Sequence, residues 1–111
     1  MANALVADDA KACVDTCNEC VQTCNACAYQ CCLPTNMVKC GRLCLDCAAI
    51  CVLCVTLLSR GSPLAAEICR ICADVCDACA DECETHDNDH CRQCAEACRR
   101  CAVQCREMAA A

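Results

Sequence analysis

The sequence has almost no aromatic residues. Phenylalanine and tryptophan are absent, and Tyr29 is the only tyrosine among 111 residues. A globular core normally depends on large apolar side chains, and this chain has few of them to offer. Its hydrophobic share of 59% counts every cysteine and many alanines. Something other than hydrocarbon must therefore fill part of the interior.

Other absences restrict the class of protein. Residues 1–9 contain neither a basic region nor a long apolar stretch, so we expect no signal sequence. We find no run of about 18 or more apolar residues that suggests a membrane span, and we expect no membrane partner. The net charge of −6 argues against nucleic acid as a partner. These features predict a single cytoplasmic domain over residues 1–111.

Cysteine, in contrast, is present in great excess. The chain has 22 cysteines, and in a reducing cytosol so many indicate metal binding rather than disulfides. Within four blocks the steps between cysteines alternate between three and four residues, which is the heptad spacing that lines one face of an α-helix. The blocks contain Cys13, Cys17, Cys20, Cys24, Cys27 and Cys31, with Cys32 as an extra; Cys40, Cys44, Cys47, Cys51 and Cys54; Cys69, Cys72, Cys76, Cys79 and Cys83; and Cys91, Cys94, Cys98, Cys101 and Cys105.

The four blocks predict an all-α fold, an antiparallel up-down-up-down four-helix bundle with a cysteine-lined core. The expected breaks carry typical capping residues: Thr35 or Asn36 before the second helix, Gly61 after it, and Asp87 or Asn88 before the fourth. Since the connections are short, neighbouring helices should run antiparallel. The predicted helices cover roughly 9–32, 36–59, 63–86 and 88–108.

Folding the blocks in this order stacks the thiols in layers. At one end the stripe continues into an apolar plug of Leu58, Ala65 and Met108, with Cys13 beside it. The opposite end offers Met37, His86 and His90, and we expect metal ions to enter there. The five predicted layers are Cys31/Cys40/Cys83/Cys91, Cys27/Cys44/Cys79/Cys94, Cys24/Cys47/Cys76/Cys98, Cys20/Cys51/Cys72/Cys101 and Cys17/Cys54/Cys69/Cys105.

A continuous column of thiols favours Cu(I). Thiolates are soft ligands that select Cu(I), Zn(II) or iron–sulfur clusters. Cu(I) accepts two or three thiolates, and a thiolate can bridge two ions, so the column could hold many ions, about 11 at two thiolates each. Bare buried thiolates are very costly, so without metal the cysteines should be neutral thiols, and loading should release protons.

Two alternatives stay open. One is a zinc or cadmium buffer of the metallothionein type, although structural zinc sites are usually discrete tetrahedra built from loops. The other is a thiol redox protein, which would need one or two accessible cysteines of low pKa that stand apart from the rest. The sequence singles out no such pair, and we expect no catalysis.

The predicted helix 36–59 has an unusual outer face. Between Leu43 and Ser59 its only charged residue is Asp46, and Leu45 and Val52 lie away from the cysteine stripe. An apolar outer face is expected to be covered in a soluble protein. We therefore predict a homo-oligomer joined largely through this helix.

The repeated C-x2-C-x3-C pattern along four helices, with histidine and methionine at one end, resembles the bacterial copper storage proteins. The resemblance spans Cys13 to Cys105, and the absence of a signal sequence is similar to the cytosolic branch of that family. It implies a homotetramer of four-helix bundles that stores or sequesters several Cu(I) ions inside each bundle. It also implies that the inward cysteines are the ligands and that Met37, His86 and His90 lie near an open mouth. Cys31 and Cys32 break the register, because adjacent residues cannot both face inward equally.

Overall fold

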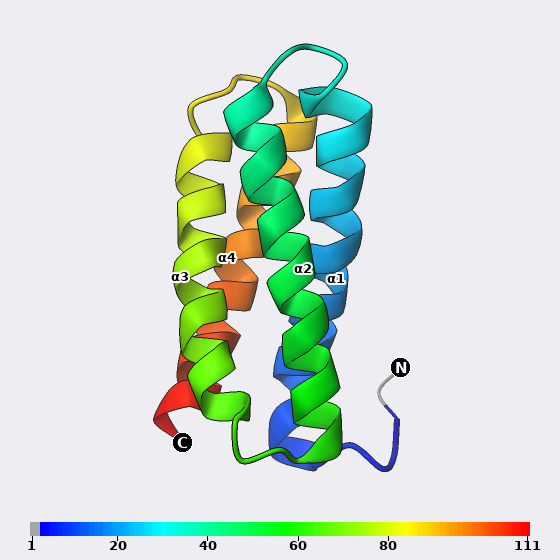
Figure 1. Cartoon of the computed structure of the whole chain (residues 1–111), viewed down its shortest axis with the longest axis vertical. Helices are drawn as coiled ribbons and strands as arrows, with labels where there is room; N and C mark the ends of the chain where they lie inside the picture. Colours follow the sequence, from blue (N-terminus) through cyan, green and yellow to red (C-terminus); the bar gives the residue numbers. More distant parts are fainter. Residues whose placement is uncertain (1–2) are drawn as a thin grey trace.

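Four long helices run antiparallel to one another in the computed structural model, which describes residues 3–111 (Figure 1). No strand occurs within these residues. Helices α1 and α3 each contact both α2 and α4, which closes a four-cornered bundle. The elements are η1 (Asp8–Ala10), α1 (Lys11–Cys27), η2 (Ala28–Cys32), α2 (Val38–Arg60), α3 (Ala65–Cys83) and α4 (Asp89–Ala110). The predicted all-α, up-down-up-down bundle is confirmed.

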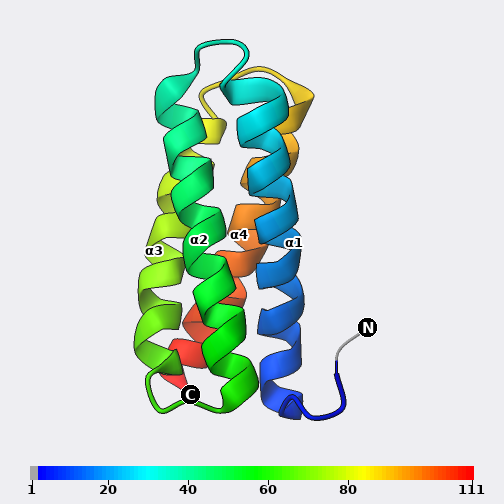
Figure 2. The same ribbon diagram turned by 45° about the vertical axis from the view of Figure 1, so that its right-hand side comes forward.

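The two ends of the bundle carry different connections. The α1–α2 and α3–α4 connections lie together at one end, which we call the upper end, and both described termini lie near the other (Figures 1 and 2). Met1 and Ala2, part of the segment in which a signal sequence was sought, lie outside the described residues. At 1.5 Å per residue the 23 residues of α2 extend about 35 Å, most of the 40 Å length of the molecule.

Two of the predicted capping residues act as expected. Gly61 ends α2 in the left-handed conformation, with a φ of 64°, and its N–H bonds back to the last turn of the helix. Asn88 begins α4, because its Oδ1 accepts a hydrogen bond of 2.8 Å from the Cys91 N–H.

The predicted cap of α2 is wrong. Helix α2 begins at Val38 behind Met37, which provides no side-chain cap. The Thr35 hydroxyl instead donates to the Cys31 carbonyl at 2.6 Å, so Thr35 closes the preceding helix. Asn36 takes a left-handed φ of 60° in the connection, a conformation that asparagine tolerates better than most residues.

Cysteine and alanine fill nearly the whole core. Twenty-one of the 22 cysteines are buried, together with nine alanines, Val14 and Leu58. No polar or charged residue is buried between residues 3 and 111. Small side chains let helix axes approach closely, and a free cysteine behaves as a small hydrophobic residue. The chain therefore forms a packed interior without large aromatic or aliphatic residues.

A π-helical turn, η2, changes the register at the top of the first helix. The prediction placed Cys31 in the uppermost thiol layer and treated Cys32 as an extra cysteine that breaks the register. The structure reverses them: Cys32 is fully buried, with its Sγ 3.8 Å from that of Cys27, while Cys31 is only half-buried. A π-helix has a wider turn than an α-helix, so residues five apart share a face, as Cys27 and Cys32 do.

Gly41 makes room for this turn on the facing helix. A Cβ atom at Gly41 would lie 3.3 Å from the Cys32 Cβ and 3.3 Å from a methyl carbon of Leu33. Gly41 is itself buried, and α2 packs directly on the segment that follows η2. The glycine thus allows the close approach that keeps Cys32 in the core.

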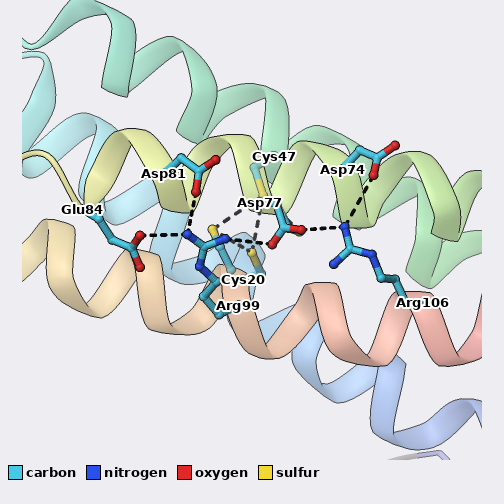
Figure 3. A network of polar contacts seen from close by, with 10 residues as sticks. Cys20, Cys47, Asp74, Asp77, Asp81, Glu84, Arg99 and Arg106 are labelled. Atoms are coloured by element: carbon cyan, nitrogen blue, oxygen red, sulfur yellow. Dashed lines mark hydrogen bonds and ion pairs between the residues drawn. The ribbon is translucent and has the colours of Figure 1, made fainter.

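Ion pairs join α3 to α4 on the outside of the bundle (Figure 3). The Arg99 guanidinium contacts Asp77 at 3.0 Å, Asp81 at 2.6 Å and Glu84 at 2.8 Å. Arg106 also pairs with Asp77, so this carboxylate links two arginines about two turns apart on α4. Ion-pair networks of this kind contribute more to stability than isolated surface ion pairs do. This network ties α3 to α4.

Helix α2 is long and apolar enough to cross a membrane by length and composition, contrary to the expectation from the sequence. This is weak evidence for a span, because the core helix of a soluble protein meets the same criterion. In the bundle the cysteines of α2 are buried, so much of its hydropathy comes from residues that line the core.

The π-helical turn predicts that one thiol differs from all others in reactivity. In the reduced protein without metal, Cys31 should be alkylated rapidly and stoichiometrically, because it is the only cysteine that is not buried. Mass spectrometry after a short pulse of a maleimide should show a single adduct. In Cys31→Ala the fast adduct should disappear, whereas in the control Cys32→Ala it should remain. A fast adduct that maps to Cys32 would contradict the assigned register.

Candidate metal centre

The buried thiols form a continuous column of sulfur–sulfur contacts. The Sγ atoms of Cys17 and Cys101 are 3.5 Å apart, as are those of Cys47 and Cys76, and those of Cys40 and Cys83 are 3.6 Å apart. Each of these contacts joins two different helices. The column therefore crosses the helix interfaces at every level instead of following separate stripes.

Three helices keep the predicted layers. The cysteines of α2 face those of α3 in the expected pairs, and those of α4 lie beside them. The α2–α3 pairs are Cys40–Cys83, Cys44–Cys79, Cys47–Cys76 and Cys51–Cys72, at 3.5 to 3.7 Å. The α2–α4 pairs are Cys44–Cys94, Cys47–Cys98 and Cys51–Cys101, at 3.6 to 3.9 Å.

Helix α1 is offset from these layers. The Cys24 Sγ lies 3.6 Å from both the Cys94 and the Cys98 sulfur, and Cys27 contacts Cys91 at 4.0 Å instead of lying level with Cys94. A sulfur that sits between two others packs as a knob into a hole, which fills space better than sulfurs placed opposite one another. The stagger of the layers comes from this packing.

Sets of four thiols are close enough to share a metal ion. In each of the five sets below, all four Sγ atoms lie within 4.8 Å of one another, and three helices contribute. From the third set onward, each set shares two members with the set before it, so a thiolate in one set can also serve the next. The sets are Cys17/Cys72/Cys101/Cys105, Cys20/Cys47/Cys51/Cys76, Cys20/Cys24/Cys47/Cys98, Cys24/Cys79/Cys94/Cys98 and Cys44/Cys79/Cys83/Cys94.

Burial controls the protonation of the column. It raises the pKa of Cys91 to about 12, and it also raises the pKa of Cys32. Hydrogen bonding with Cys20 raises the pKa of Cys24, whereas hydrogen bonding with Cys24 lowers that of Cys94. A thiol that donates is thus held protonated while the one that accepts is stabilised as a thiolate. With no buried cation between residues 3 and 111, a column of thiolates needs metal to balance its charge.

The structure separates the three residues predicted for the open mouth. Met37 is half-buried and packs against the upper end of the core. His86 is half-buried in the α3–α4 connection, and its Nε2 lies 3.0 Å from the Glu82 carboxylate. His90 is exposed in the first turn of α4, where it lines a shallow pocket together with Cys27. The three side chains therefore do not form one ring of ligands.

Two residues near this end make contacts that the sequence analysis did not predict. Asn88 accepts a hydrogen bond from the Cys31 thiol at 3.6 Å in addition to capping α4. Glu82 contacts both His86 and Lys39, the latter at 3.4 Å, and so links α2, α3 and the last connection. The four-residue spacing of Glu82 and His86 was a signal that could have found this pair.

The lower end is closed, as predicted. Leu58 and Ala65 are buried there, and Met108 is half-buried. The Cys13 Sγ lies 3.7 Å from that of Cys105, so Cys13 extends the column downward by one more thiol. The thiol column therefore stops at an apolar seal.

Comparison with known proteins identifies solved structures that share this architecture. No curated protein matches the chain. Among solved structures, apo copper storage protein 3 from Bacillus subtilis is 46% identical, over 90% of this chain and 98% of the other, with a TM-score of 0.85. The Cu(I)-bound copper storage protein BsCsp3 is 44% identical, over 92% and 99%, with a TM-score of 0.87.

A cytosolic copper storage protein from Streptomyces lividans, in a structure with five coppers, is 37% identical, over 94% of both chains, with a TM-score of 0.87. The same organism's protein is known loaded with 10 copper equivalents. The sequence model that matches residues 6–110 describes copper storage proteins, a family whose role is storage and not catalysis. With 22 cysteines in one bundle core and this match along almost its whole length, the chain belongs to the copper storage protein family.

Proposed function

We propose that this chain stores or sequesters many Cu(I) ions on the cysteine thiolates inside its bundle. The observation that carries the proposal is the sharing of sulfurs between neighbouring four-thiol sets, for example of Cys24 and Cys98. Shared thiolates bridge metal ions, and Cu(I) accommodates two or three such ligands. The column is thus built for a cluster that grows along its length. It is not a series of separate sites.

Charge balance sets the capacity. Each buried thiolate adds one negative charge and each Cu(I) cancels one, so the core becomes neutral as the number of ions approaches the number of thiolates. At two thiolates per ion, half of the charge would remain. When thiolates bridge ions, the column holds more Cu(I), and the additional ions cancel the remaining negative charge. The short sulfur–sulfur distances allow such bridging. Loading well beyond one ion for every two cysteines is therefore favoured.

The proposed ligands are the inward cysteines, now with Cys32 in place of Cys31 in the upper layer. Cys31, Met37, His86 and His90 would act during uptake and release at the upper end. We propose a cytosolic location, and no catalysis, since the one half-buried thiol, Cys31, has no partner cysteine that shares its exposure. Nucleic acid and membranes are not proposed as partners.

We also propose that four copies of the chain assemble through α2. Its outer face exposes Val52 and Leu53, and α3, which packs against α2, exposes Ile71; each is 42% exposed or more. Adjacent apolar side chains on two helices form the kind of patch that a second copy covers. The half-buried Leu45 extends the patch toward the upper end.

The storage function is tested by an anaerobic titration of the reduced protein with Cu(I) against a competing chelator. We expect tight uptake of more than about ten ions per chain with helicity retained, because that load needs the whole thiol column. A parallel titration with Zn(II) should saturate at fewer ions. Saturation at one or two Cu(I), or equal avidity for Zn(II), would refute copper storage and favour a zinc buffer.

Uptake should weaken as the pH falls. Burial raises the pKa of Cys91 to about 12, so at neutral pH this thiol holds its proton until Cu(I) displaces it. Protons and Cu(I) compete, and the apparent affinity should drop about tenfold per pH unit for each proton released. Competition titrations between pH 8 and pH 6, corrected for the chelator's own protonation, measure this slope. An affinity independent of pH would show that the thiols are already ionised.

The assembly is tested by sedimentation velocity at micromolar concentration. The wild-type chain should sediment as a tetramer, and Leu53→Glu should dissociate it, because a carboxylate cannot be buried in an apolar interface at low cost. The matched control is Val103→Glu on α4, a residue that is 55% exposed against 42% for Leu53 and lies outside the patch. A wild-type monomer, or dissociation by the control alone, would refute the proposed interface.

A further inference from the structure

Four thiols near the middle of the column lie almost at the corners of a regular tetrahedron. This central set consists of Cys20 and Cys24 from α1, Cys47 from α2 and Cys98 from α4. Five of its six Sγ–Sγ distances are 3.6 to 3.9 Å, and the sixth, between Cys24 and Cys47, is at most 4.8 Å. Figure 3 shows Cys20 and Cys47 pointing toward one another behind the ion pairs of α3 and α4.

These distances match the size of a four-coordinate zinc site. Zn(II) forms bonds of about 2.3 Å to cysteine sulfur, so the sulfurs of a regular tetrahedron around it lie about 3.8 Å apart. Each of the other four sets named above is joined by only two or three sulfur–sulfur contacts of hydrogen-bond geometry. The central set, with five, is therefore the one closest to a preformed tetrahedral site.

The central set also contains a thiol that is prepared to lose its proton. Hydrogen bonding with Cys101, Cys24 and Cys47 lowers the pKa of Cys20, and hydrogen bonding with Cys20 raises the pKa of Cys24 and of Cys98. Cys20 thus accepts hydrogen bonds from its neighbours, which stabilise its thiolate. A metal ion can bind this thiolate first and then displace the protons of the neighbouring thiols.

We propose that the central set is a tetrahedral site for a single Zn(II) ion, filled in the copper-free protein and vacated when Cu(I) loads the column. A closed site of four cysteine sulfurs is typical of structural zinc. Fe(II) also accepts four thiolates, but it binds less tightly than Zn(II) to the same ligands. The inference does not rest on the storage function, because it concerns the chain before copper arrives.

The sharing of thiols limits zinc at this point to one ion. The central set shares Cys20 and Cys47 with one neighbouring set and Cys24 and Cys98 with another. Zn(II) in the central set occupies both pairs, so neither neighbouring set can complete a tetrahedron of its own. Four thiolates around one Zn(II) also leave a net charge of about −2, which is costly to repeat inside the core. Cu(I) cancels one charge per ion on shared thiolates, so a low zinc capacity is compatible with a high copper capacity.

A single ion at this position would connect the whole bundle. Its ligands come from α1, α2 and α4, and Arg99 and Arg106 already tie α4 to Asp77 of α3 outside the core. A core of thiols and alanines buries little hydrocarbon, so the copper-free fold has much to gain from a metal crosslink. Metal that binds only the folded state adds its binding free energy to the stability of that state.

The geometry is tested by anaerobic titration of the reduced, metal-free wild-type chain with Co(II), followed by Zn(II). Co(II) held by four thiolates in a tetrahedron absorbs intensely in the visible range, whereas octahedral Co(II) is pale. We expect one Co(II) per chain with the tetrahedral spectrum, bleached by one equivalent of Zn(II), and a higher unfolding temperature with zinc bound. Excess Cu(I) should then release the Zn(II) to a zinc indicator. A pale spectrum, or no tight binding of Zn(II), would overturn the site.

The position is tested by removing single ligands. Cys24→Ala and Cys98→Ala should each weaken Zn(II) binding at least about a hundredfold and abolish the tetrahedral Co(II) spectrum. The matched control is Cys69→Ala, which removes an equally buried thiol outside the central set and should change the affinity by less than about threefold. Circular dichroism checks that the variants are folded, and Cys47→Ala replaces any that is not.

Equal weakening in Cys69→Ala would overturn the assignment to the central set. A wild-type chain that takes up more than ten Cu(I) but binds no Zn(II) tightly would refute this inference and leave the storage function intact. Tight binding of one Zn(II) with uptake of no more than one or two Cu(I) would refute the storage function and support the zinc site.

Discussion

The contact between buried thiols is the interaction on which the rest of this structure depends. A protonated cysteine packs as a small apolar group, and here such groups lie 3.5 to 4.0 Å apart along the bundle axis. A deprotonated cysteine is a charged ligand that is costly to bury alone. The same side chains therefore hold the bundle together without metal and bind the metal when it arrives, and the exchange of protons for Cu(I) connects the two states.

This double role explains the unusual composition. A core of thiols and alanines buries little hydrocarbon, so the fold needs help from elsewhere. The helices are long, the connections are short, and arginine–carboxylate pairs join α3 to α4 outside the core. Binding of metal to the folded state alone would add further stability, because each four-thiol set draws on three helices and ties them together.

The surroundings of the thiol column differ between its two ends. It ends below at Leu58 and Ala65, which exclude water from the lowest thiols. Above, Asn88 and His90 bring polar groups close to the sulfurs of Cys31 and Cys27. The shallow pocket that His90 lines together with Cys27 lies in this upper half. Every cysteine except Cys31 is buried, so the thiols of the column are shielded from bulk solvent.

The sequence by itself determined the architecture and the chemistry. The alternating three- and four-residue steps from Cys13 to Cys105 define four helices with one cysteine face each, because only an α-helix aligns residues at that spacing. Short connections then leave an antiparallel bundle with the cysteines inward, and a column of thiols favours soft metal ions. The caps Gly61 and Asn88 could also be identified, since their roles depend on local backbone geometry.

Only the tertiary structure decided what depends on contacts between helices. The half-layer offset of α1 arises from sulfurs packing between sulfurs of α4, a matter of side-chain shape at an interface. The inward position of Cys32 depends on a π-helical turn that fits against Gly41, and adjacent cysteines in a sequence do not reveal which of them will face the core. The separation of His86 from His90 likewise follows from how the last connection crosses the bundle, because residues close in sequence can face different grooves once a helix has begun between them.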